Sequence, residues 1–200
     1  AAEGATVGIL DADIYGPSQP MMLGVTGRPE SLDGQNMQPM EGHGIQVMSI
    51  GFLVDADQAM IWRGPMATQA LDQLLRQTAW RDLDYLIVDM PPGTGVPILG
   101  IVENMAVYCC PNCGHTEHIF GADGGKNMAA EYKVDYLGAL PLTMKIREQA
   151  DSGTPTVAAE PDGDIAHIYK TVARQVAVKI ADKSKDFSAK FPTITVSKNT

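Results

Sequence analysis

A short apolar run that ends in a carboxylate constrains the fold of this chain more than any other feature. The run is Tyr85–Asp89, and a Pro-Pro-Gly-Thr-Gly loop follows it almost directly. An apolar run of this length is typical of a strand buried on both faces of a parallel sheet. Thr6–Leu10 is a second such run, and an Asp-Ala-Asp sequence follows it. The two runs predict an α/β fold with a doubly wound, mostly parallel sheet and helices on both faces.

The carboxylates at these strand ends are candidate ligands for a metal–nucleotide complex. Ligands of open α/β sheets bind beyond the carboxyl ends of the strands. Asp89 could hold a water molecule of Mg²⁺ there. Asp11 and Asp13 leave their strand two residues apart and therefore on one side, so that one faces the metal and the other an attacking water. Acidic residues also cap turns and helices, so a structural role for each Asp stays open.

The loop after Asp89 is a candidate phosphate-binding segment. Gly93, Thr94 and Gly95 can offer backbone N–H groups to a terminal phosphate. The sequence contains no Gly-x-x-x-x-Gly-Lys-Ser/Thr loop, which commonly supplies the main phosphate contacts. Because Ala1–Gly4 is typical of the last turn of a helix, we expect that such a loop precedes it in the complete protein.

The segment after Asp89 is too short to connect two neighbouring parallel strands. Val96–Val102 is another apolar run, and only the Pro-Pro-Gly-Thr-Gly loop separates it from Leu86–Asp89. Parallel neighbours need a crossover of about a dozen residues or more. We therefore expect further residues after Gly95 in the complete protein, and a separation between Gly95 and Val96 much longer than the ~1.33 Å of a peptide bond.

A Cys-x-x-Cys turn marks a candidate metal site. Cys110 and Cys113 can bind one metal as thiolates, and Gly114 can adopt the left-handed conformation that turns N–H groups towards sulfur. Two sulfurs are half of a four-thiolate site, and His115 and His118 follow too closely to match zinc-finger spacing. The economical solution is a homodimer in which each copy contributes both cysteines to one shared centre.

Several kinds of thiolate centre remain open at this stage. Thiolates select zinc, Cu(I) or iron–sulfur clusters, so a structural zinc and a thiol redox pair are alternatives to a cluster. The chain has only three cysteines, Cys109 included, and all lie in one loop, which argues against a disulfide framework. Unpaired clustered thiols indicate a reducing compartment, and we expect the cytoplasm.

Composition and length restrict the remaining classes. The net charge of −9 argues against nucleic acid as a partner, and no apolar run reaches the length of a membrane span. The length of 200 residues suits one domain. We expect a single nucleotide-binding domain over residues 1–182, with the cysteine loop inserted near 109–118, and a C-terminal tail over 183–200.

With these motifs in hand, the chain resembles the Mrp-type family of iron–sulfur cluster carrier ATPases. This family belongs to the deviant-Walker-A branch of P-loop NTPases, with MinD-like proteins, and has a SIMIBI-like fold. The Asp-Ala-Asp-x-x-Gly-Pro-Ser and Cys-Pro-x-Cys-Gly-His strings are the most specific, and the resemblance extends to about residue 182. The matching stretches are Gly8–Ser18, Trp62–Met66, Val88–Gly95, Gly100–Met105, Cys110–His115, Ile119–Gly121, Leu137–Leu142 and Ile146–Glu148.

The resemblance implies an ATP-dependent homodimer that holds a labile [4Fe-4S] cluster and transfers it to apo-proteins. It assigns orientation of the hydrolytic water to Asp13 and the Mg²⁺ shell to Asp11 and Asp89. It assigns γ-phosphate sensing to Gly93–Gly95, and adenine binding to Asn104 with the loop at Pro141. The family also has an Asp and on the order of 40 further residues after Gly95, beyond the minimum crossover.

Two other functions are compatible with the same residues. One is a MinD-like regulatory ATPase whose Cys-x-x-Cys binds structural zinc. The other is a metal-binding dimer that does not hydrolyse ATP, as expected if Val96 did follow Gly95 directly in the complete protein.

Overall fold

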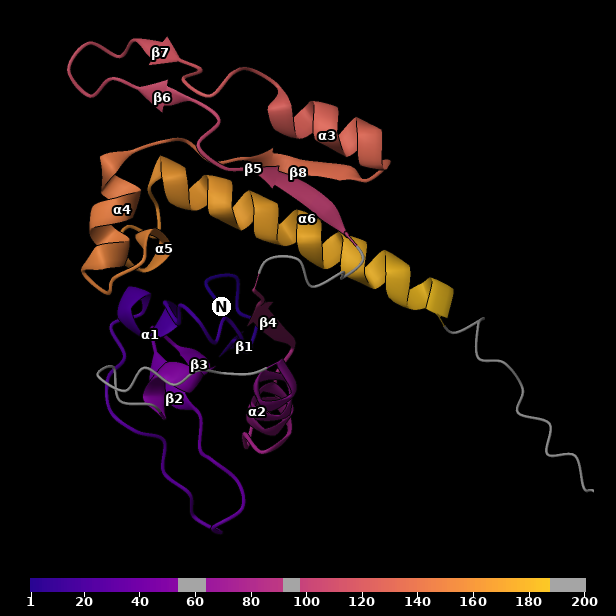
Figure 1. Ribbon diagram of the computed structural model, residues 1–200. Coiled ribbons are helices and arrows are strands. Elements are labelled where there is room, and N and C mark those ends of the chain that lie inside the picture. The colour runs from indigo at the N-terminus through magenta and orange to yellow at the C-terminus, as the bar shows by residue number, and fades with distance from the viewer. Residues whose placement is uncertain (54–63, 92–97, 188–200) are drawn as a thin grey trace, which may run out of the picture. The chain divides into compact units, whose positions relative to one another are not determined.

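The computed structural model describes residues 1–53, 64–91 and 98–187 (Figure 1). Contacts within the chain form two compact units. The first unit comprises Ala1–Val96 and Leu142–His167, and the second comprises Pro97–Pro141 and Ile168–Thr200. The expected single domain therefore stays a prediction, as does the separation between Gly95 and Val96, which lies outside the described residues.

The first unit contains a four-stranded, mostly parallel sheet with the order β2-β3-β1-β4. Strand β1 pairs in parallel with β3 and β4, while β2 pairs antiparallel with β3. These pairings confirm the α/β fold that the apolar runs predicted. The elements of this unit are β1 (Val7–Asp11), α1 (Gln19–Met22), β2 (Met40–Gly42), β3 (Ile45–Ser49), the 3₁₀ helix η1 (Ile50–Phe52), α2 (Gly64–Arg76), β4 (Tyr85–Asp89), α4 (Met144–Asp151) and α5 (Thr156–Ala159).

Apolar side chains cover both faces of the central strands. Successive residues of a strand point to opposite faces, so Ile9 and Leu10 of β1 belong to different clusters. Leu10 packs with Leu74 of α2 on one face. Ile9 packs on the other face, in a cluster of Leu23, Val25, Val47 and Phe52. The central strands β1 and β3 therefore lie between two apolar layers.

Strand β4 is less buried than its sequence predicts. Ile87 is 51% exposed and Val88 is 40% exposed, so the expectation of a strand buried on both faces was wrong. The reason is its position, because among the described strands β4 pairs only with β1 and forms the edge of the sheet. An apolar run shows that a strand can be buried, whereas its neighbours decide whether it is.

The second unit contains a parallel pair, β5 with β8, and an antiparallel hairpin of β6 with β7. Its elements are β5 (Gly100–Glu103), β6 (Tyr108–Cys109), β7 (Thr116–Glu117), α3 (Gly124–Tyr132), β8 (Asp135–Ala139) and α6 (Asp164–Phe187), whose residues from Ile168 onward belong here. The hairpin projects beyond the β5–β8 pair in Figure 1. Helix α6 continues to Phe187, past the expected start of the tail at residue 183, and the rest of the expected tail lies outside the described residues. None of the helices in the described ranges is both long and apolar enough to cross a membrane.

Candidate functional site

Polar residues meet at the carboxyl ends of three adjacent strands in the first unit. Asp11, at the end of β1, is in register with Ser49 of β3 and with Asp89 of β4. The backbone N–H of Ala12 donates to the Asp89 carbonyl oxygen at 2.8 Å, which ties the two strand ends together. The structure therefore brings Asp11 and Asp89 side by side at the edge of the sheet where α/β proteins bind ligands.

The carboxylate of Asp11 is fully buried and held by three hydrogen bonds. Ser49 Oγ donates to Oδ2 at 3.0 Å, the backbone N–H of Gln19 donates to Oδ2 at 3.2 Å, and that of Asp13 donates to Oδ1 at 3.3 Å. Burial raises the pKa of Asp11, the charge of Asp89 adds to the rise, and the three hydrogen bonds oppose it. A cation beside this carboxylate would favour its ionised form.

Gln19 and Ser49 are site residues that the sequence analysis missed. Gln19 connects the two carboxylates, because its backbone N–H contacts Asp11 while its Nε2 donates to Asp89 Oδ2 at 2.8 Å. Ser49 could have been found, because the apolar run from Ile45 predicts a strand that ends beside it. Gln19 carried no such signal, since a contact across 70 residues of sequence follows from no local pattern.

Asp13 lies in the turn that follows β1 and is half-buried. Its Oδ1 accepts a hydrogen bond from the backbone N–H of Tyr15 at 3.3 Å, and its carbonyl oxygen accepts one from Gly16 at 3.3 Å. The carboxylate thus supports the turn, which is the structural role left open for it. Because that role uses an acceptor oxygen and not the negative charge, it does not compete with the orientation of a water molecule.

The residues expected to hold adenine lie together in the second unit. Asn104 is exposed and follows β5. Its Oδ1 accepts a hydrogen bond from the backbone N–H of Met105 at 3.0 Å. The N–H of Leu140 donates to the carbonyl oxygen of Glu103 at 2.8 Å, and the N–H of Ala106 donates to the carbonyl oxygen of Leu140 at 3.0 Å. This ladder places Asn104 beside the start of the Pro141 loop. Gly93, Thr94 and Gly95 lie outside the described residues.

The strand-end residues fit a magnesium–nucleotide complex. Mg²⁺ is commonly held by one or two carboxylates, while water and phosphate oxygens fill its other positions. Asp11 and Asp89 supply that number of carboxylates, and Ser49 and Gln19 fix them in place. In the parts of the chain that the structure describes, no group of three or more His, Cys, Asp or Glu side chains could hold a metal by itself.

The Cys-x-x-Cys segment forms the loop of the β6–β7 hairpin. The backbone N–H of Cys110 donates to the carbonyl oxygen of His115 at 2.8 Å, and the N–H of Gly114 donates to the carbonyl oxygen of Cys110 at 2.9 Å. Gly114 has a φ of +72°, the left-handed conformation expected of it. Hydrogen bonds from the N–H groups of Cys113 and Asn112, and from the Cys113 side chain, lower the pKa of Cys110. The side-chain hydrogen bond from Cys113 also places the two sulfurs close together.

The remaining candidate ligands near the loop have other contacts. Cys109 lies in β6, and its Sγ is 3.8 Å from the carbonyl oxygen of Gly114. His118 places Nδ1 at 2.7 Å from the carbonyl oxygen of Ala106. The side chains of Cys110 and Cys113, in contrast, contact each other.

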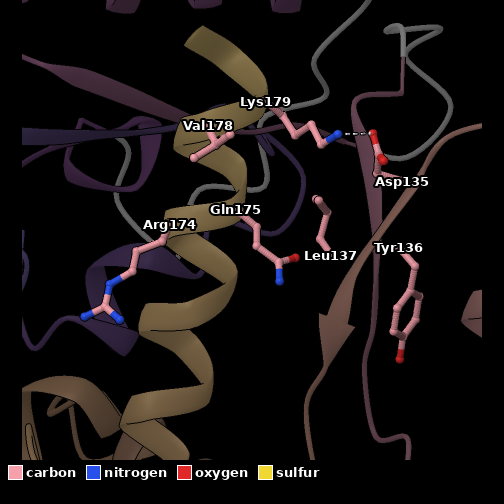
Figure 2. A pocket seen from close by; sticks show the side chains of 7 residues that line it. All are labelled: Asp135, Tyr136, Leu137, Arg174, Gln175, Val178 and Lys179. Carbon is pink, nitrogen blue, oxygen red and sulfur yellow. Dashed lines mark ion pairs between the residues drawn. The ribbon is translucent and has the colours of Figure 1, made fainter. Parts of the chain in front are cut away.

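A shallow pocket between β8 and α6 contains none of the candidate site residues (Figure 2). Leu137 and Val178 give it an apolar lining, and Lys179 Nζ forms an ion pair with Asp135 Oδ2 at 3.0 Å at one side. It carries neither the carboxylate pair of the first unit nor the sulfurs of the hairpin.

Comparison with known proteins gives one consistent family. The family model described as NUBPL iron-transfer P-loop NTPase (ParA) matches residues 1–96 and 94–177. An iron-sulfur cluster carrier protein of Pseudomonas fragi is 47% identical over 215 residues, which cover 86% of this chain and 75% of that protein. The iron-sulfur cluster carrier protein of Escherichia coli K12 is 46% identical over 221 residues, which cover 90% and 60%.

Two further similarities come from a eukaryotic relative and from a solved structure. The mouse iron-sulfur cluster transfer protein NUBPL is 39% identical over 214 residues, which cover 87% of this chain and 67% of the mouse protein. A nucleotide-binding protein of Archaeoglobus fulgidus in complex with ADP superposes with a TM-score of 0.66 and 29% identity, covering 81% of this chain and 78% of that one.

The alignments also show that the relatives have more residues than this chain. The chain spans 60% of the Escherichia coli protein. The alignment with the Pseudomonas protein is 215 residues long but covers only 86% of this chain of 200 residues, so the relative has residues that this chain lacks. The family match is divided between residues 94 and 96. Both specific motifs, the strand-end carboxylates and the Cys-x-x-Cys loop, lie inside the matched residues. The chain belongs to the NUBPL-type iron-transfer P-loop NTPases, the family that its motifs resemble.

Proposed function

We propose that this chain acts in an ATP-dependent iron–sulfur cluster carrier, which binds a [4Fe-4S] cluster at a homodimer interface and transfers it to apo-proteins in the cytoplasm. The observation that carries the proposal is the half-site at the hairpin, where Cys110 and Cys113 present two adjacent sulfurs. A [4Fe-4S] cluster takes four cysteine thiolates, so two copies of the chain complete one site. The names of the relatives support the same function.

The nucleotide side of the function uses the strand ends. Asp11 and Asp89 would hold Mg²⁺, which neutralises the charge that develops on a transferred phosphate. Gln19 and Ser49 keep the two carboxylates in register. Asp13 would orient the attacking water through the oxygen that the turn does not use. Gly93–Gly95 and Asn104 with Pro141 remain the predicted contacts to phosphate and adenine.

The cargo side requires a site that both binds and releases a cluster. The loop residues from Pro111 to Phe120 are all exposed, so the cluster would lie at the surface, within reach of an apo-protein. Because only two ligands come from each copy, separation of the copies removes half of the ligands. This division of the ligands explains how a carrier can release its cargo.

Three cysteine variants test the proposal. Cys109→Ala, Cys110→Ala and Cys113→Ala are reconstituted anaerobically with iron and sulfide, and iron, zinc and molecular mass are measured. We expect Cys109→Ala to retain iron and the other two to lose it, because adjacent residues of an extended segment point to opposite faces. Full retention of iron in Cys110→Ala, or one tightly bound zinc per monomer, would contradict the bridging cluster.

Transfer is tested with the iron-loaded wild-type chain. Mixed with an apo-protein that requires a [4Fe-4S] cluster, it should restore that protein's absorption, and Cys113→Ala should not. If the wild-type chain holds its cluster but never yields it to an apo-protein, the carrier function is wrong, although the metal site is right.

A further inference from the structure

Two large apolar side chains occupy an exposed turn directly after the cysteine hairpin. The N–H of Gly121 donates to the carbonyl oxygen of His118 at 3.0 Å, which closes a turn with Ile119 and Phe120 at its central positions. Ile119 is 51% exposed and Phe120 is 71% exposed. Central positions of turns usually hold Gly, Pro, Asn, Asp or Ser, so this pair is unusual.

A third exposed apolar residue, Met105, precedes the residue to which the turn is anchored. His118 Nδ1 lies 2.7 Å from the carbonyl oxygen of Ala106, so the turn is anchored beside the segment that contains Met105. Met105 is 41% exposed and has a φ of +55°, a constrained backbone conformation. We refer to Met105, Ile119 and Phe120 as the apolar turn patch. Grouped exposed apolar side chains of this kind are typical of interaction surfaces.

The apolar turn patch lies at the base of the hairpin that presents the two sulfurs. Strand β7 ends at Glu117, directly before the turn, and its partner β6 ends at Cys109, directly before Cys110. The pairing of β6 with β7 fixes the base of the hairpin relative to its loop. The patch therefore borders the hairpin that carries the two sulfurs.

We propose that the apolar turn patch is the contact through which a second copy of this chain docks beside the shared Cys110–Cys113 centre. The inference rests on the proposed function and adds the surface that holds the two copies together. The half-site needs a partner with two further thiolates, and no group of three ligands exists in the described parts of one chain. A two-fold axis through the centre makes the interface isologous, so each copy would contribute its patch to the same interface.

The charge of the chain favours an apolar contact over a polar one. Each copy carries a net charge of −9, so two copies repel each other at low ionic strength. Apolar burial does not depend on the sign of charge and can offset that repulsion. It would also exclude water from the cluster, so the patch should set both the affinity of the dimer and the lifetime of its cargo.

The test compares the dimer affinity of iron-loaded variants by analytical ultracentrifugation. Phe120→Ser and Ile119→Ser remove apolar side chains from the patch, while Phe120→Leu keeps an apolar one. Tyr132→Ser is the matched control, because Tyr132 is 58% exposed but lies at the far end of α3. Circular dichroism checks that each variant is folded, and iron per chain is measured in parallel.

We expect the dimer dissociation constant to rise about tenfold or more in Phe120→Ser and Ile119→Ser, on the scale of one buried apolar side chain. Phe120→Leu should recover most of the affinity, and Tyr132→Ser should match the wild type. A folded Phe120→Ser that dimerises like the wild type, with iron bound, overturns the inference and leaves the bridging cluster intact. Zinc-loaded monomers of the wild type overturn both.

Discussion

Asp13 supports a turn, and this structural role can be separated from the catalytic role proposed for it. Its Oδ1 accepts the Tyr15 N–H at 3.3 Å, so part of the carboxylate is structural. The amide oxygen of Asn can accept the same hydrogen bond, whereas Ala cannot. Substitution at this position therefore separates the structural role from the electrostatic one.

We expect Asp13→Asn to keep its fold and its nucleotide affinity but to lose hydrolysis by about 10²–10⁴-fold, the usual contribution of a positioned acid or base. Asp13→Ala should lose hydrolysis and also lower the free energy of unfolding by about 1 kcal/mol, because the turn loses its acceptor. Phosphate release, nucleotide titration and denaturation are measured. If Asp13→Asn turns over like the wild type, the residue is only a turn cap.

At the scale of elements, the packing of helices against strands decides which helix residues are buried and where a glycine is required. Leu74 of α2 is buried and Ala70 packs against its cluster, whereas Met66 and Leu75, which helical spacing places near the same face, are 50% and 41% exposed. Helix α3 meets β5 through a glycine, since a Cβ at Gly125 would lie 2.7 Å from the Cβ of Glu103. The carboxylate of Glu103 accepts a hydrogen bond from the Tyr136 hydroxyl at 3.0 Å, which fixes the Glu103 side chain in place.

Gly125→Ala should therefore destabilise the second unit by about 1–3 kcal/mol, the cost of overpacking a close contact. Gly124→Ala is the matched control, because its Cβ would meet Glu103 Oε1 at an ordinary 3.6 Å. The control should be neutral or should stabilise α3 by up to about 1 kcal/mol, since Ala favours helix. Urea denaturation followed by circular dichroism distinguishes the two, and equal stabilities would contradict the contact.

At the scale of the whole molecule, segments far apart in sequence close the first unit. Gly153 follows α4, and its Cβ position lies 2.6 Å from the Cα of Gly24, which follows α1. The ring of His43 places Nε2 at 2.8 Å from the Gly153 carbonyl oxygen. The stretch from Leu142 to His167 thus returns to the N-terminal part of the chain and completes its compact unit.

Gly153→Ala should lower the free energy of unfolding by about 2–5 kcal/mol, because it combines a φ of +75° with a clash against backbone atoms. Gly34→Ala isolates the backbone contribution, since Gly34 has a φ of +71° and no atom within 4 Å of its Cβ position. That control should lose about 1–2 kcal/mol. If both variants lose the same amount in denaturation experiments, the contact between Gly24 and Gly153 contributes nothing.

The sequence alone determined the features that depend on local geometry. The carboxyl ends of parallel strands share one edge of a sheet, so the apolar runs that lead to Asp11 and Asp89 were enough to place both residues at that edge, where the structure pairs them. The left-handed Gly114 and the Cys110–Cys113 turn follow equally from their own few residues. The family was also predicted from these motifs, and the comparisons confirm it.

Only the tertiary structure decided which residues support those motifs. Gln19 reaches Asp89 across 70 residues, and Gly125 is required by Glu103, a residue of another element. Strand β4 has the apolar sequence of an interior strand, yet it lies at the edge of the described sheet, with Ile87 half exposed. Burial and support depend on which segments pack together, and the local periodicity of a chain contains no information about that pairing.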